Sequence, residues 1–165
     1  MNAGHGLLGA ASPRVPAVVT GGTGEVLSYR QLEQLSCRLA RLFHENGLRP
    51  GDHIAVLMDN TPDYFVACWA GQRSGLHITP VNWHLTTDEA AYIVDDCGAR
   101  ALVASPAVAD LAATVCARAP AVELRLLAGD GPVGPRAHRA GFRHLRTALA
   151  PYPSAPPAAE TEGSL

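Results

Sequence analysis

The sequence predicts an α/β fold, in which a mainly parallel β-sheet is flanked by helices and preceded by a β-hairpin. Short apolar and β-branched runs alternate with segments whose apolar residues recur at helical spacing. This alternation is typical of parallel strands joined by right-handed helical crossovers. The composition, 47% hydrophobic and 17% charged, is that of a globular chain.

The first two strand-like runs, residues 15–20 and 26–29, flank the stretch Thr20-Gly21-Gly22-Thr23-Gly24. This stretch is similar to the start of a dinucleotide-binding turn. Such a turn requires a glycine where Leu27 stands and a helix N-terminus facing the phosphate. Glu25 would also bring a carboxylate close to a pyrophosphate. We therefore expect a hairpin here. A stand-alone nucleotide-binding domain that uses the Gly21–Gly24 turn is the alternative.

The later elements are bounded by helix caps and by glycines. Ser28 is a cap for the first helix and Gly47 its stop, while Thr86 and Glu89 form a capping box. The expected elements are a helix over 29–46, a strand over 53–58, a helix from 60–62 to 74, a strand over 77–81, a helix ending at 98, a strand over 101–105, a helix over 106–119, a strand over 122–128, a loop over 129–140 and a short helix over 141–150.

Three segments are expected along the chain. Residues 1–13 are expected to form a flexible lead-in, residues 14–150 the α/β N-terminal subdomain, and residues 151–165 a Pro-rich, disordered tail.

Charge and cysteine usage exclude several classes of function. The net charge is −2, and all 13 basic residues are dispersed arginines, which argues against nucleic-acid binding and against chemistry that needs a lysine. No run approaches the roughly 20 apolar residues of a membrane span. The four cysteines lie in helical patterns without metal-ligand spacing, so we expect buried thiols and a cytoplasmic location. They are Cys37, Cys68, Cys97 and Cys116.

Four residues are candidates for flanking a pocket, because each follows a predicted strand at the carboxyl edge of the sheet. Asn60 opens a helix, whose N-cap is expected to be Asn60 or Thr61 before Pro62, so the alternative role of Asn60 is a helix cap. Asn82, Trp83 and His84 stand on the loop after the next strand. Trp83 could instead cover the core, and His84 could simply meet solvent. No nucleophile–base pair or metal-ligand spacing is visible, so we assign no catalytic, cofactor-binding or metal-binding residue.

Residues 27–105 resemble the start of the adenylate-forming (AMP-forming) acyl-CoA synthetases, an AMP-binding enzyme family. The resemblance rests on the order and spacing of several marks rather than on any single one. These are Ser28-Tyr29-x-x-Leu32, Gly47 with Gly51-Asp52, Asn60 with Pro62, Pro80-x-Asn82, the acidic capping box and the run "YIVDDCGA". The stretch "PVNWHLT" favours the fatty-acyl branch.

The resemblance implies a two-step reaction, in which a fatty acid attacks ATP to give an acyl-adenylate and the thiol of coenzyme A then displaces AMP, with Mg²⁺ neutralising phosphate charge. The family's phosphate loop is expected just beyond residue 165, so the chain is read as an N-terminal fragment that is inactive alone. Sheet edges that later segments would cover are expected to promote self-association. A non-catalytic interaction module is the further alternative.

Overall fold

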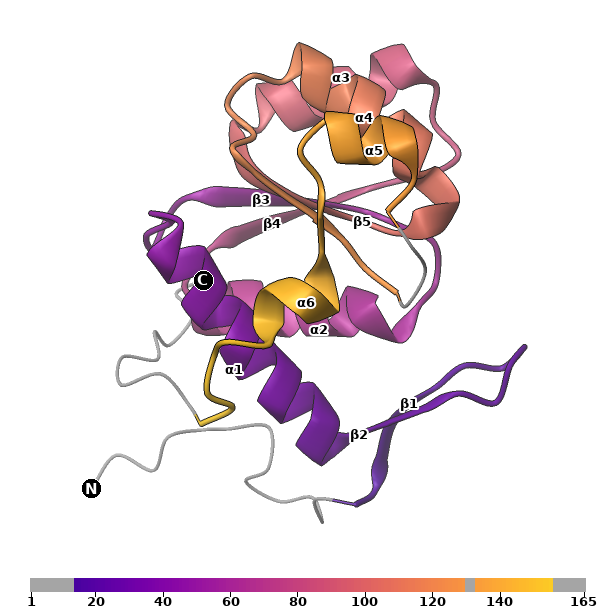
Figure 1. Cartoon of the computed structure of the whole chain (residues 1–165), viewed down its shortest axis with the longest axis vertical. Coiled ribbons are helices and arrows are strands. Elements are labelled where there is room, and N and C mark those ends of the chain that lie inside the picture. Colours follow the sequence, from indigo (N-terminus) through magenta and orange to yellow (C-terminus); the bar gives the residue numbers. More distant parts are fainter. Residues whose placement is uncertain (1–13, 130–132, 156–165) are drawn as a thin grey trace.

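Five parallel strands form the centre of the computed structural model, which describes residues 14–129 and 133–155 (Figure 1). Their order across the sheet is β4-β3-β5-β6-β7. The strands are β3 (His53–Leu57), β4 (His77–Val81), β5 (Ala99–Ala104), β6 (Leu124–Leu127) and β7 (Arg143–His144). All four neighbouring pairs are parallel, which confirms the fold class expected from the sequence.

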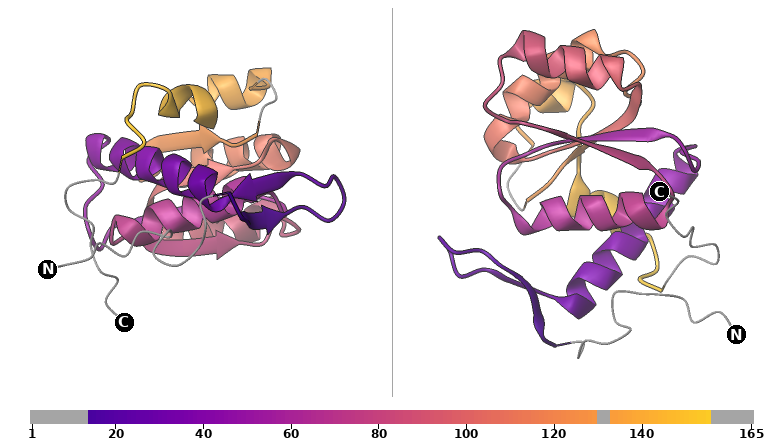
Figure 2. Two further views of the ribbon diagram at one scale, coloured as in Figure 1. Left: turned by 90° about the horizontal axis from the view of Figure 1, so that it is seen from below. Right: turned by 180° about the vertical axis from the view of Figure 1, so that it is seen from behind.

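Helices cover both faces of the sheet, as Figure 1 and Figure 2 show. One face carries α1 (Tyr29–Glu45), α2 (Pro62–Arg73) and α6 (Leu145–Leu149), and the other carries α3 (Thr87–Asp96), α4 (Ala109–Arg118) and α5 (Pro135–Arg139). Successive side chains of a strand point to opposite faces of the sheet, so strands that are buried on both faces contribute to a core on each side. In β3, Ile54 and Val56 join the core under α1 and α2, whereas Ala55 and Leu57 join the core under α3 and α4.

The hairpin forms a separate two-stranded sheet that projects from the α/β body (Figure 2). Strands β1 (Pro16–Val19) and β2 (Val26–Ser28) pair antiparallel, with Val19 opposite Val26. The turn is closed by the Thr20 N–H, which donates to the Glu25 carbonyl at 2.9 Å. Gly24 has a φ of 71°, a conformation that favours glycine. No helix begins at this turn, so the hairpin prediction is confirmed.

Both predicted capping residues cap their helices. Ser28 and Thr86 each accept a hydrogen bond from the third helical residue, and the side chains of Gln31 and Glu89 complete the two capping boxes. Helix α1 ends one residue earlier than predicted, and Gly47 follows with a φ of 84°.

The predictions for the C-terminal third need correction. The expected loop over 129–140 contains α5, and the expected helix over 141–150 begins instead with the two-residue strand β7 before α6. The expected helix over 106–119 starts with a 3₁₀ turn, η1 (Pro106–Val108). These elements have two to five residues, which is too short for a periodic pattern, and β7 is a strand only through its pairing with β6.

The two ends of the chain lie mostly outside the described residues. That holds for the lead-in over 1–13 and for residues 156–165. Of the Pro-rich tail, residues 151–155 are described, and Tyr152 there donates its hydroxyl to Glu45 of α1 at 2.9 Å. Within the described ranges, no helix has the length and apolar character that a bilayer crossing requires.

Candidate functional site

The carboxyl edge of the sheet is where the fold places a candidate site. From β3 the chain passes through α2 to β4 on one side, and then through α3 to β5 on the other side of β3. Such a reversal of strand order marks the preferred ligand position in open α/β sheets. The ends of β3 and β5 are joined there, because the Asp59 N–H donates to the Ser105 hydroxyl oxygen at 3.4 Å and the Ser105 N–H to the Leu57 carbonyl at 3.2 Å.

Asn60 lines a cleft at this edge, between the hairpin and the start of α2. The cleft has a volume of about 480 Å³, with one wall from the hairpin and the other from the turn into α2. Its lining residues are Val18, Val19, Thr20, Gly21, Asn60, Thr61, Tyr64 and Phe65. The N-cap of α2 is Thr61 rather than Asn60, so the alternative role of Asn60 as a helix cap is wrong. Asn60 is exposed at the mouth of a partly apolar cleft.

The loop after β4 holds the other three candidates. The Asn82 side-chain oxygen accepts a hydrogen bond from the His84 N–H at 3.0 Å, which fixes the turn. The Trp83 and His84 rings lie against each other, with centroids 3.6 Å apart and an angle of 32° between their planes. Trp83 is 39% exposed and therefore does not cover the core. The loop presents a stacked aromatic pair to solvent.

These candidates share an edge but not one pocket. Asn60 follows β3 and the Asn82–His84 group follows the neighbouring strand β4. Among the described residues, no hydrogen bond or ring contact joins the two groups. Within the same ranges, no set of three or more His, Cys, Asp or Glu side chains could hold a metal ion. The candidates thus form two separate groups at this edge.

Sequence reasoning missed Asp63, which organises the edge from inside. Its side chain is buried, and one carboxylate oxygen accepts the Gly129 N–H at 2.9 Å while the other accepts a guanidinium N–H of Arg146 at 2.7 Å. Asp63 therefore ties the start of α2 to the end of β6 and to α6. An acidic residue in the first turn of a helix is common because it suits the helix dipole, so its position alone gave no signal.

The cysteine prediction is only partly correct. Cys37 and Cys116 are buried, but Cys68 and Cys97 are half-buried. Burial raises the pKa of the Cys116 thiol to about 11 and also raises the pKa of Cys68. Both thiols are protonated near neutral pH, which makes them poor nucleophiles.

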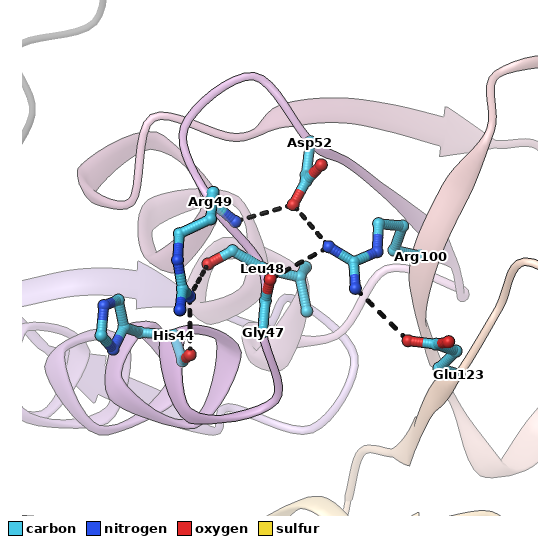
Figure 3. A network of polar contacts seen from close by, with 7 residues as sticks. All are labelled: His44, Gly47, Leu48, Arg49, Asp52, Arg100 and Glu123. Carbon is cyan, nitrogen blue, oxygen red and sulfur yellow. Dashed lines mark hydrogen bonds and ion pairs between the residues drawn. The ribbon is translucent and has the colours of Figure 1, made fainter.

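The opposite, amino edge of the sheet carries a polar network around Asp52 and Arg100 (Figure 3). Asp52 accepts the Arg49 N–H at 2.7 Å and a guanidinium N–H of Arg100 at 2.8 Å, and Arg100 also contacts Glu123 at 3.3 Å and the Gly47 carbonyl at 3.0 Å. The Arg49 N–H, followed by Arg100, lowers the pKa of the Asp52 carboxyl. The network links the starts of three strands and faces no pocket at the ligand edge.

The strand order and the candidate site define the class of protein: a doubly wound α/β unit, in which ligands favour the carboxyl edge of the sheet. Comparison with known proteins agrees with this class. The family model described as "AMP-binding enzyme" matches residues 9–159. A fatty acid–[acyl-carrier-protein] ligase, ScoC, of Streptomyces coeruleorubidus is 38% identical over 90 residues, which are 54% of this chain and 17% of the relative. A feruloyl-CoA synthase of Amycolatopsis sp. is 38% identical over 117 residues, 68% of this chain and 23% of the relative.

Solved structures show the same fold. An anthranilate CoA ligase, AuaEII, superposes with a TM-score of 0.73 at 20% identity, over 84% of this chain and 26% of that one. The chain belongs to the AMP-binding enzyme family. It spans about a fifth of the length of the curated relatives it matches.

Proposed function

We propose that this chain is the N-terminal part of an ATP-dependent, AMP-forming acyl-CoA ligase, which makes an acyl-adenylate and then an acyl-CoA thioester. The observation that carries the proposal is the family match over residues 9–159, together with relatives that are named as ligases. The fold supports it, because the described residues superpose on the corresponding part of a CoA ligase.

The chain's part in such an enzyme is structural. It has no lysine, and its glycine turn is a hairpin rather than a turn that leads into a helix N-terminus, which supports a triphosphate site elsewhere in the ligase. ATP, Mg²⁺ and coenzyme A are therefore proposed to bind to other parts of the ligase. The isolated chain is proposed to be inactive.

The substrate is proposed to be a fatty acid, which the similarity to a fatty acid ligase supports. A cytoplasmic location is proposed as well, and four cysteines without a disulfide in the described residues support it. We also propose that Asn60, Asn82, Trp83 and His84 flank the pocket of the whole ligase, since they lie at the sheet edge that ligands favour.

Substrate-dependent exchange of pyrophosphate into ATP tests this proposal. The isolated chain should give no exchange above a blank with fatty or aryl acids. Exchange by the isolated chain would show that a triphosphate site is present. Binding of a nicotinamide nucleotide that Gly22→Val abolishes would favour the stand-alone nucleotide-binding alternative. Co-purification with a separately encoded ligase remainder would favour an interaction module.

A further inference from the structure

Two histidines lie next to each other at the amino edge of the sheet. His53 begins β3 and His77 begins β4, and the parallel register places them directly opposite each other. The centroids of their imidazole rings are 4.6 Å apart, with an angle of 33° between the ring planes. His53 is half-buried and His77 is exposed. The two rings thus form a pair that solvent can reach.

Backbone hydrogen bonds hold the chain firmly around this pair. The His77 N–H donates to the Asp52 carbonyl at 2.9 Å, and the Gly51 N–H donates to the Gly75 carbonyl at 2.8 Å. Both side chains therefore start from fixed backbone positions, and only their own torsions have to change for the rings to turn toward a common partner. The outer torsion of a histidine side chain has a broad minimum, so such a turn costs little.

The ring nitrogens of the pair suit a metal ion. Neutral histidine is the commonest metal ligand in proteins, and it binds through the ring nitrogen that carries no proton. The buried Nδ1 of His53 has no hydrogen-bond partner among the residues that the structure describes, so no protein contact has to be broken before this ring turns. Two nitrogens that each bind one ion at about 2 Å lie about 3 Å apart. Ring rotation can reach this separation from centroids 4.6 Å apart.

The surroundings of the pair favour a cation. Helix α3 ends at Asp96, two residues before Ala99, which lies opposite His53 in β5. The last turn of α3 holds no basic residue, and a helix C-terminus attracts positive charge. Within residues 14–129 and 133–155, no Asp, Glu or Cys side chain joins the two histidines in a set of three. The described residues therefore supply two nitrogen ligands, and water supplies the remaining ones.

We propose that His53 and His77 bind a divalent ion of the late first-row transition metals, such as Ni²⁺, Cu²⁺ or Zn²⁺, and that the ion links the start of the end strand β4 to β3. Imidazole nitrogen selects these ions over Mg²⁺ and Ca²⁺, which prefer oxygen ligands. The pair lies at the opposite edge of the sheet from the candidate pocket, and the proposal does not depend on the proposed ligase function.

Calorimetric titration of the whole chain with Ni²⁺ tests this proposal. One ion should bind per chain, and an excess of Mg²⁺ of about a hundredfold should not displace it. His53→Asn and His77→Asn should each weaken Ni²⁺ binding at least about tenfold, because a single imidazole loses the second, intramolecular contact. Since the ion binds the folded state, it should raise the thermal unfolding midpoint of the parent and not that of either variant.

His138→Asn is the matched control, because it makes the same change at an exposed position on α5, away from the pair. It should leave Ni²⁺ binding unchanged. Circular dichroism checks that each variant is folded, and the exposed position of His77 keeps the test available if His53→Asn does not fold.

Three results would overturn the proposal. One is the absence of Ni²⁺ binding by the parent chain, and another is equal binding by the parent, both pair variants and the control. The third is loss of binding in Cys68→Ala or Cys97→Ala, because it would place the ion at a half-buried thiol instead of the two histidines.

Discussion

At the residue scale, a buried ion pair joins α1 and α2. Arg73 donates to Glu33 at 2.8 Å and to the Cys37 sulfur at 3.0 Å, and the two charged side chains are only 6% and 8% exposed. Both charges have left water, so each depends on the other for compensation. The pair fixes how the two helices sit against each other, since a shifted register would leave a charge alone in the core.

Removing one partner should therefore cost far more than removing both. We expect Arg73→Ala to lower the free energy of unfolding by about 3 kcal/mol, because it leaves Glu33 charged and buried. The double variant Glu33→Leu with Arg73→Met should lie within about 1 kcal/mol of the parent. Urea unfolding measures both, and Arg139→Ala should change stability by less than about 0.5 kcal/mol. A double variant as unstable as Arg73→Ala would contradict this account.

Asp52 gives a prediction that depends on pH. Its pKa is lowered in the folded protein by the Arg49 N–H and by Arg100. A carboxyl group whose pKa is lower in the folded than in the unfolded protein stabilises the fold at pH values above its unfolded pKa of about 4. This stabilisation is lost as the pH falls through the pKa of the folded protein. Asp52→Asn should thus destabilise the chain clearly at pH 7 and much less near pH 3. Urea unfolding at the two pH values tests this. Asp95→Asn, at an exposed position, is the control, and an equal loss at both pH values would refute the assignment.

At the element scale, Gly71 sets how closely α2 approaches the sheet. A Cβ atom there would lie 2.8 Å from Ile78 Cγ1 and 3.0 Å from Ile54 Cδ1, which is closer than carbon atoms normally pack. The glycine therefore allows the helix to lie directly on β3 and β4, although glycine itself has a low helix propensity.

Gly71→Ala should therefore destabilise the chain, although alanine is the better helix former. We expect a loss of about 1 kcal/mol, because overpacking outweighs the gain in propensity. Combining Gly71→Ala with Ile78→Val should restore part of that loss by removing a crowding methyl group. Thermal unfolding of the two variants shows whether the cost of overpacking or the gain in helix propensity is larger. A single variant more stable than the parent would mean that the helix can move away at little cost.

Much of the element order could be predicted from the sequence, because long elements repeat their signal. The helix of α1 combines a Ser28 cap, regular leucines and Gly47, and β3 is a continuous apolar run. Elements such as β7 and α5 are too short to repeat a pattern and depend on tertiary pairing. The candidate Asn60 followed from strand and helix order, whereas the role of Asp63 depends on contacts 66 and 83 residues away in sequence.

At the scale of the whole molecule, both end strands of the sheet, β4 and the two-residue β7, are paired on one side only within the described residues, and β4 is the longer of the two. Strand β4 is at the end of the strand order, and only its β3 side is paired within the described residues. An unpaired edge can pair with another chain, although Pro80 removes one donor from it. An open edge of this kind supports the prediction from the sequence that the isolated chain self-associates.

Self-association should show as a mass above the 17.3 kDa monomer that rises with concentration in light scattering. His77→Lys places a charge at an exposed edge position and should shift the mass toward the monomer. His44→Lys, at the exposed end of α1, is the matched control and should have no effect. A stable, monodisperse parent monomer would argue against edge pairing.

The central claim is that this chain is a scaffold part of an acyl-CoA ligase and does not itself hold the triphosphate. The most direct measurement is acid-dependent ATP–pyrophosphate exchange by two proteins. One is the isolated chain, and the other is a chimera in which the part of this chain that matches the feruloyl-CoA synthase replaces the matched segment of that synthase, an alignment of 117 residues. We predict no exchange by the isolated chain and exchange by the chimera within about tenfold of that synthase, which corresponds to 1.4 kcal/mol. Exchange by the isolated chain, or a folded chimera without exchange, would contradict the account.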